Sequence, residues 1–336
     1  MKYAVRGRAV FACVSILLLL LTFVSLAVGS YPLTGRDILR SFGELFSPEP
    51  SMAARVFWGL RFPRTAVALL SGMTLGLCGG VYQMIFGSPL ASPDLTGVAS
   101  GASLGAAFAI VLGAGSSVLR MGAAFLGGVL SLLLVFLLVR FSDGGRVHTY
   151  ILAGIIISAS ADAGLMILKT LADPERQLAA IDFWTMGSLA SVSSEKAAPL
   201  AVLLLPALSV LLICRRPVTM LSLGGEECGV VGLSDRFWRA FLLLTATLAV
   251  SAATSVTGVI GFIGLIAPHI ARYLLRRRSG GYLLLCGMTG GVLLLAADLA
   301  ARSLGGGAEL PVSIFTVAAG VPVLIALLCT GKGAGG

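Results

Sequence analysis

The chain has 336 residues, of which 57% are hydrophobic and only 12% are charged, and its formal net charge is +9. A soluble globular domain carries about 25% charged residues, so this composition excludes a soluble protein and indicates an all-α polytopic membrane protein. A basic balance can mark a nucleic-acid-binding protein, but in a membrane protein it more often reports topology.

The first apolar run, Ala9 to Val28, follows three basic residues. Ala27-Val28-Gly29 could serve as a signal-peptide cleavage site, but a signal peptide has an apolar core of only about 7–15 residues. We therefore interpret the run as a retained first transmembrane helix with its N-terminus in the cytoplasm. The polar, proline-containing stretch from Tyr31 to Arg61 is predicted to be an external loop with short helical pieces.

The second span, Pro63 to Phe86, and the third, Leu95 to Gly113, both carry glycines four residues apart. Such a row of small residues lets another helix approach closely within a membrane. The two prolines in Ser88–Pro93 predict a turn or a broken helix between the two spans. The glycines in question are Gly72, Gly76, Gly80, Gly97, Gly101 and Gly105.

Seven further apolar spans bring the predicted number of transmembrane helices to about ten, with both ends of the chain on one side. The loops on the N-terminal side carry 14 of the 24 Lys and Arg residues, and those on the other side carry 10, which favours an N-in, C-in arrangement. A polar segment, Ala172 to Lys196, contains an amphipathic piece around Trp184. The further spans are Val118–Arg140, His148–Leu171, Ala197–Cys214, Ala240–Thr257, a stretch through Pro268 and His269 to Arg278, Tyr282–Ser303 and Pro311–Thr330.

One cytoplasmic segment, Leu221 to Arg239, is unusually rich in charge for this chain and lies between two apolar spans. Within it Cys228, Val231 and Leu233 recur at helix-like spacing, and glycines interrupt the pattern. This pattern is typical of a short amphipathic helix pair that lies against another protein at the membrane surface. The alternative is a solvated loop between two transmembrane helices.

No motif in the sequence indicates a catalytic residue. The chain has no nucleotide-binding P-loop, no HExxH and no GxSxG, which disfavours an enzyme. Its only histidines are His148 and His269, and its six cysteines form no CxxC pair, so we expect no metal site.

Asp162 is the one acidic residue deep within an apolar span. A charge there costs at least about 2.5–3.5 kcal/mol if it faces lipid, so it should face a cavity or a partner. It could bind a proton or cation or line a pathway. Alternatively, it could form a structural hydrogen bond with Ser158 or Ser160.

Six motifs, in order along nearly the whole chain, resemble those of the permease subunits of ABC importers for iron-siderophores, haem and vitamin B12, the FecCD/BtuC-like family. RFPR stands here for that family's RLPR, and SPLASP for its NPLA-x-P. The motifs are Arg61–Thr65, Ser88–Pro93, Gly97–Ala102, Leu221–Gly224, Gly258–Arg272 and Glu309–Val312.

The resemblance implies a type II ABC importer permease fold, with residues 1–336 forming one transmembrane domain in a bacterial or archaeal cytoplasmic membrane. It implies a homodimer or a pseudo-dimer with a pathway along the dimer axis. Two separate cytoplasmic ATPase subunits would bind ATP and Mg²⁺, an external binding protein would deliver a metal chelate, and no cofactor would be bound by this chain. Nucleic acid is not expected as a partner.

The resemblance also assigns roles to residues. Residues 219–236 would form coupling helices that contact the ATPase, and Arg61 and Arg302 would face outward and pair with acids of the binding protein, although basic residues at this depth can also simply snorkel to the interface. Asp162 would line the pathway. The predicted coupling residues are Leu221, Gly224, Glu226, Glu227, Gly232 and Arg236, and the predicted cytoplasmic gate residues are Ser88, Leu90, Val147 and His148, of which His148 could instead cap its helix.

A second function remains open from the sequence. Broken spans and a lone intramembrane acid are also features of ion-coupled secondary transporters, in which Asp162 would be the coupling site. The sequence does not distinguish siderophore, haem and cobalamin as the cargo.

Overall fold

The structure is a computed structural model that describes residues 2–29, 31, 33–44, 49–142, 147–222, 234–275, 281–304 and 310–329. Within these residues every regular element is helical, as the composition predicted. The helices are α1 (Lys2–Ala27), α2 (Gly35–Gly43), α3 (Met52–Val56), a π-helical turn (Phe57–Arg61), α4 (Phe62–Ile85), a 3₁₀ turn (Pro93–Thr96), α5 (Val98–Val111), α6 (Ser117–Arg140), α7 (Val147–Leu171), α8 (Gln177–Thr185), α9 (Ser194–Ile213), α10 (Arg215–Leu221), α12 (Asp235–Thr257), α13 (Ile263–Leu275), α14 (Tyr282–Leu304) and α15 (Val312–Cys329).

Seven helical stretches in the described part of the chain are long and apolar enough to cross a membrane. Three further apolar helices, α5, α13 and α15, are shorter. All ten correspond to spans expected from the sequence, although the number that cross the bilayer stays a prediction. The amphipathic piece around Trp184 forms α8, and α10 is a short helix that the sequence pattern did not reveal.

The external loop is shorter than predicted. α3, the π-helical turn and α4 follow one another without a break, so a single helical stretch of 34 residues runs from Met52 to Ile85. The Ser51 side chain caps its start by accepting a hydrogen bond from the Ala54 N–H. Pro63 has no N–H to donate, and the wide π-helical turn directly before it lets the helix continue.

α4 and α14 pack against each other through their glycines. A Cβ atom added at Gly72 would meet the Gly290 carbonyl, and one added at Gly76 would meet the Cys286 carbonyl. The backbones therefore approach more closely than any side chain would allow, which is the role predicted for this glycine row. α5 meets α6 in the same way at Gly101.

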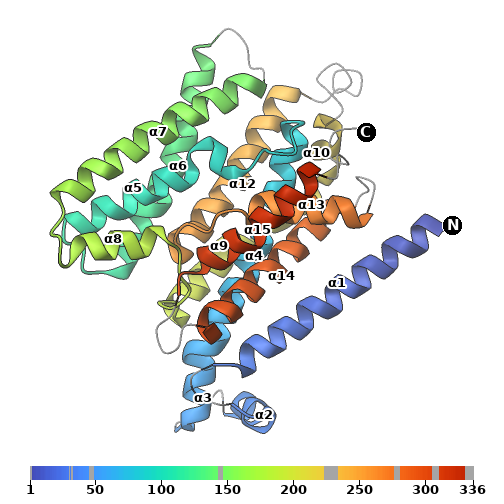
Figure 1. The fold of residues 1–336 in the computed structure, drawn as a ribbon, viewed down its shortest axis with the longest axis vertical. Coiled ribbons are helices and arrows are strands. Elements are labelled where there is room, and N and C mark those ends of the chain that lie inside the picture. The colour runs from blue at the N-terminus through green and yellow to red at the C-terminus, as the bar shows by residue number, and fades with distance from the viewer. Residues whose placement is uncertain are drawn as a thin grey trace.

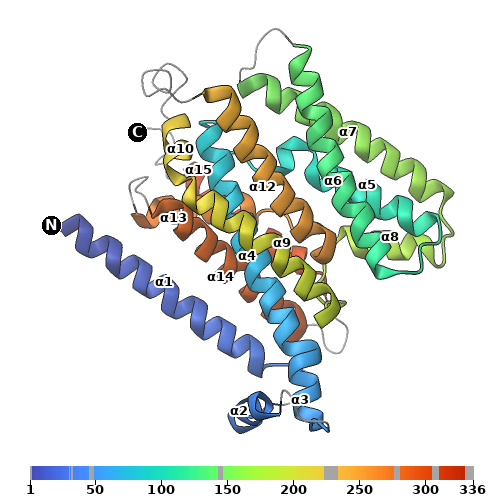
Figure 2. The same cartoon turned by 180° about the vertical axis from the view of Figure 1, so that it is seen from behind.

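The helices form one bundle around α4 and α12, whose buried side chains contribute to the main apolar core. α5, α6, α7 and α8 form one side of the bundle, α1 lies along the opposite edge, and α2 and α3 project at one end (Figure 1, Figure 2). We call this the α2 end, which is predicted to face outward, and we call the opposite end the α10 end.

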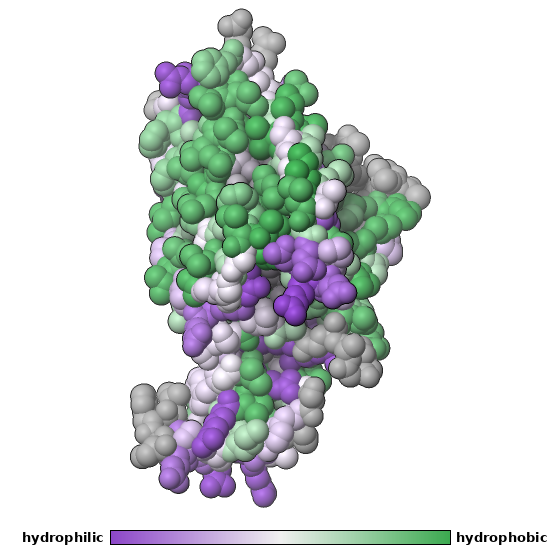
Figure 3. Space-filling view, turned by 90° about the vertical axis from the view of Figure 1, so that its left-hand side faces the viewer, coloured by the Kyte–Doolittle hydropathy of each residue, from purple (hydrophilic) through white to green (hydrophobic). Residues whose placement is uncertain are grey.

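The surface on the α7 side is largely apolar. Figure 3 shows hydrophobic side chains over most of this face, bounded below by a hydrophilic group. α7 alone exposes Leu152, Ile155, Ile156, Met166 and Ile167. Such a wide apolar face suits lipid or another membrane-embedded subunit.

Candidate functional site

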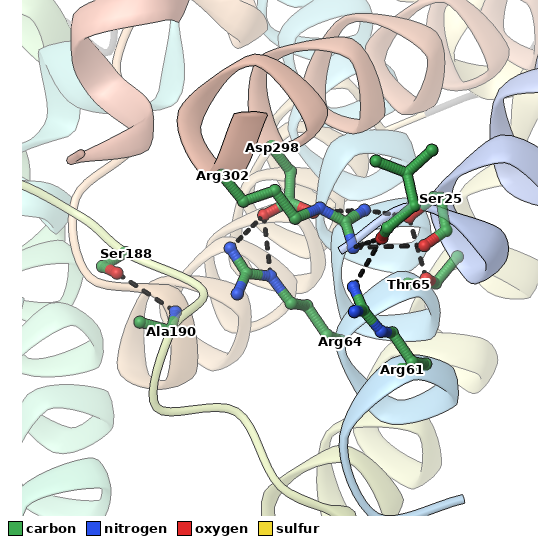
Figure 4. Close-up of polar contacts among 9 residues, drawn as sticks. Ser25, Arg61, Arg64, Thr65, Ser188, Ala190, Asp298 and Arg302 are labelled. Atoms are coloured by element: carbon green, nitrogen blue, oxygen red, sulfur yellow. Dashed lines mark hydrogen bonds and ion pairs between the residues drawn. The ribbon is translucent and has the colours of Figure 1, made fainter. Parts of the chain in front are cut away.

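A cluster of arginines around one carboxylate lies near the α2 end. Asp298 and Arg302 are four residues apart on α14, so they share one face of that helix. Asp298 is fully buried, and its Oδ1 accepts hydrogen bonds from Nε and Nη2 of Arg64 at 3.0 and 2.9 Å. Its Oδ2 lies 3.1 Å from Nη2 of Arg302. One buried carboxylate thus pairs with two guanidinium groups from two helices (Figure 4).

The two arginines predicted to dock a binding protein hold the end of α1. Arg61 donates from Nη1 to the Val28 carbonyl and from Nη2 to the Tyr31 carbonyl, the latter at 3.3 Å. Arg302 donates from Nη1 to the carbonyls of Ser25 and Val28, both at 3.1 Å. A cationic donor is stabilised at this position, because the last carbonyls of a helix have no partners within the helix and carry partial negative charge.

Both arginines lie near the α2 end, which is predicted to face outward, and their side chains are buried within the chain. The Arg61 residue is only 8% exposed and the Arg302 side chain only 5%. Both guanidinium groups point into the chain because its own carbonyls and the Asp298 carboxylate attract them. Their role in docking a binding protein stays a prediction.

The predicted coupling segment, residues 219–236, is described only at its two borders. Leu221 is the buried last residue of α10, and Arg236 is an exposed second residue of α12. Residues 223–233 lie outside the described residues, and with them Gly224, Glu226, Glu227 and Gly232.

Arg239, three residues after the predicted coupling segment, connects the start of α12 to α4, and sequence reasoning missed this contact. It was counted as one of several charges of a surface segment, but it is only 7% exposed. It donates from Nη1 to the Ile85 carbonyl at 2.8 Å and from Nη2 to Asp235 Oδ1 at 2.9 Å. Its position one turn inside an apolar helix was the available signal, because a charge there needs partners.

The structure brings the two predicted gate segments to the same end of the bundle. α4 ends at Ile85, and the chain turns at Gly87 with a φ of 60° before reaching Ser88 and the exposed Leu90. The Phe86 ring lies 6.2 Å from the ring of Tyr150 on α7. This contact places Ser88 and Leu90 near the start of α7, where Val147 and the exposed His148 lie. Their gating role stays a prediction.

Asp162 lies exposed on the apolar face of α7. The hydroxyl of Ser160 donates to the Ile156 carbonyl of its own helix at 2.8 Å rather than to Asp162. An acid amid exposed isoleucines and methionines requires a polar environment outside this chain. Among the residues that the structure describes, no three His, Cys, Asp or Glu side chains gather closely enough to hold a metal ion.

Comparisons with known proteins agree on one family. Residues 17–330 match the model of the FecCD transport family. The chain is 32% identical over 97% of its length to a protein named as an ABC transporter permease of Methanocaldococcus jannaschii, covering 96% of it. It is 34% identical over 94% of its length to the vitamin B12 import system permease protein BtuC of Salmonella paratyphi A, covering 93% of it. A solved structure described as an inward-facing conformation of a metal-chelate type ABC transporter has a TM-score of 0.85 at 32% identity, with 96% of this chain and 99% of that one covered.

Proposed function

The chain belongs to the FecCD transport family, is a permease component of an ABC importer, and, we propose, carries an iron chelate (siderophore or haem) or cobalamin into the cytoplasm. The observation that carries this proposal is the agreement of fold and sequence over nearly the whole chain with a metal-chelate type transporter. The B12 import permease among its relatives supports the same class of cargo.

ATP hydrolysis on a separate subunit supplies the energy in this proposal. The sequence contains no P-loop, so ATP and Mg²⁺ would bind to two cytoplasmic ATPase subunits. These subunits would contact residues 219–236, and the hydrogen bond from Arg239 to Ile85 would carry their movement to α4.

The assembly that we propose is a pair of permease subunits in the cytoplasmic membrane of a bacterium or archaeon. The apolar face of α7 would then lie in the dimer, with Asp162 lining a polar pathway between the subunits. Ser88, Leu90, Val147 and His148 would close its cytoplasmic mouth. An external binding protein would deliver the cargo at the α2 end.

Reconstitution tests both the energy source and the cargo. The permease would be placed in liposomes with the ATPase and the binding protein, and uptake of cobalamin, haem and a ferric siderophore would be measured with ATP and with a hydrolysis-deficient ATPase. We expect uptake of one cargo only when ATP is hydrolysed. Uptake driven by an ion gradient without the ATPase, and abolished by Asp162→Asn, would instead establish an ion-coupled transporter.

A further inference from the structure

A cavity of about 190 Å³ lies at the end of the bundle opposite α10, apart from the arginine cluster. Its walls come from the start of α6, from α8, from the start of α9 and from the end of α12. Because α12 begins beside the end of α4 at the α10 end, its last residues lie at the end predicted to face outward. We call this cavity the α6–α9 pocket.

Two cations line the α6–α9 pocket, and each lies in the first turn of a helix. Arg120 is the fourth residue of α6, and Lys196 is the third residue of α9. A helix N-terminus already carries about half a positive charge, so a cation in the first turn is unfavourable unless an anion is near. Two such ends face one pocket.

The chain provides little negative charge to offset these cations. The described residues that line the pocket include no aspartate or glutamate. Lys196 Nζ donates to the carbonyl and hydroxyl oxygens of Ser191, at 2.7 and 3.3 Å, and both are neutral acceptors. Of the nearby acids, Glu195 is exposed beside Lys196 on α9, and Asp182 pairs with Lys169 at 2.8 Å. For Arg120, no ion pair or side-chain hydrogen bond forms within the described part of the chain.

The floor of the pocket is held in place by backbone hydrogen bonds. The Ser188 N–H donates to the Thr257 carbonyl at 2.8 Å, and the Ser188 hydroxyl accepts from the Ala190 N–H at 3.1 Å (Figure 4). The backbone segments around Gly187 and Gly258 pass close to each other, and both glycines have a positive φ, 70° and 71°. A Cβ atom added at either glycine would meet the backbone of the other segment. The pocket is therefore largely formed before any ligand arrives, which lowers the entropic cost of binding.

We propose that the α6–α9 pocket binds a carboxylate group. Arg120 and Lys196 would provide charge-assisted hydrogen bonds, and the hydroxyl of Ser117 would add a neutral donor. Trp184 and Phe183 provide an aromatic wall for the carbon chain that bears the carboxylate. This combination suits an organic acid better than a small inorganic anion, because an inorganic anion has no carbon chain to pack against the aromatic wall.

The carboxylate has two possible sources, and both rest on the proposed function. One is a carboxylate of the metal chelate itself as it enters from outside. The other is an acidic side chain of the binding protein that delivers the chelate. Both present the same chemistry at the end predicted to face outward.

Binding to the permease alone is tested with glutarate as the probe and its neutral diamide as the control. Thermal stability and Trp fluorescence of the purified protein in nanodiscs would be followed as glutarate is added. We expect glutarate to raise the melting temperature and to change the fluorescence saturably, and the diamide to do neither. Trp184→Phe should remove the fluorescence change while keeping the thermal shift.

The double variant Arg120→Gln with Lys196→Gln should bind glutarate at least about tenfold more weakly. Arg36→Gln, which removes an exposed cation of α2 outside the pocket, should bind it normally. Equal glutarate affinity in the double variant and the native protein would overturn the proposal, as would an equal response to the diamide. A double variant that does not fold is replaced by each single variant.

Two further measurements distinguish the sources. If the binding protein provides the acid, the double variant should bind the empty binding protein more weakly. If the chelate provides it, that affinity should be unchanged, and uptake of a carboxylate-bearing chelate should fall relative to an uncharged one. A double variant that changes neither measurement contradicts the proposal, whereas ATP-independent uptake by the native protein contradicts the proposed function instead.

Discussion

The guanidinium of Arg239 and the carbonyl of Ile85 join the start of α12 to the end of α4 through a hydrogen bond of 2.8 Å. Arg239 follows the predicted coupling segment, and Ile85 precedes the predicted gate residues Ser88 and Leu90. The α4 end offers its last carbonyls without helical partners, and a cationic donor satisfies one of them. We therefore expect this contact to carry a movement of the predicted coupling segment to the predicted gate.

Arg239→Gln should weaken both the fold and the coupling. Loss of a buried hydrogen bond from a charged group costs about 1.5–3 kcal/mol, so the melting temperature should fall. In the reconstituted importer, ATP hydrolysis should continue while uptake falls. The neighbouring Arg236→Gln variant, which changes an exposed side chain, should keep the native melting temperature. A native melting temperature in the Arg239 variant would contradict this account.

Asp298→Asn should be strongly destabilising. It removes the charge that compensates the guanidinium groups of Arg64 and Arg302, and breaking a buried ion pair costs about 3–5 kcal/mol. Thermal or denaturant unfolding in detergent measures the change. Asp162→Asn, at an exposed position, serves as the matched control and should unfold like the native protein. Equal stability of the two variants would show that the cluster contributes nothing to the fold.

Arg61→Gln should affect two measurements at once. The variant loses the donors to Val28 and Tyr31, so amide hydrogen exchange at the end of α1 should become faster. If Arg61 also docks the binding protein, affinity for that protein should fall about fivefold or less, since a solvent-exposed ion pair contributes about 0.2–1 kcal/mol. Faster exchange with native affinity would assign Arg61 a purely structural role.

Gly76→Ala should disrupt the contact between α4 and α14. The added methyl group would collide with the Cys286 carbonyl, and the two helix backbones would have to separate. Overpacking of this kind costs about 1–3 kcal/mol, measurable as a lower melting temperature. Gly122→Ala on α6 is the control, because nothing lies within 4 Å of the added Cβ atom. There alanine should be neutral or stabilising, as it favours the helix.

Glu226→Arg combined with Glu227→Arg should lower the ATP hydrolysis that the assembled importer shows when the loaded binding protein is present. The double charge reversal acts on the predicted contact with the ATPase and lies away from the apolar spans, so the melting temperature of the isolated permease should stay native. Hydrolysis and uptake are measured together in liposomes. Native values for both would count against a coupling role for this segment.

Elements that depend on long apolar runs and on glycine spacing could be predicted from the sequence. Lipid requires every backbone group to be paired within its own segment, so each apolar run of sufficient length becomes a helix. The spacing of Gly72 and Gly76 indicated a close helix contact, because only small residues allow two helix backbones to approach each other closely. It did not indicate α14 as the partner, since any helix could have filled that role.

The charged side chains were harder to predict. The resemblance to the FecCD/BtuC-like family predicted outward-facing roles for Arg61 and Arg302, but it did not predict that the chain itself buries their side chains. The backbone carbonyls near the end of α1 that both arginines contact lie up to 277 positions away in the sequence. Local spacing contains no information about these long-range contacts, whereas the pair of Asp298 and Arg302 follows from their four-residue spacing on one helix.

The amino-acid sequence by itself determined that this protein is a helical membrane protein, because hydropathy and backbone pairing in lipid act locally along the chain. Only the tertiary structure decided which charges are buried and which gather around a pocket. The pairing of Asp298 with Arg64, the hydrogen bond from Arg239 to Ile85, and the pocket shared by Arg120 and Lys196 all arise from helices brought together by packing. A buried charge is stable only beside a counter-charge or a hydrogen-bonding carbonyl. Which such group lies near it depends on the whole arrangement of the helices.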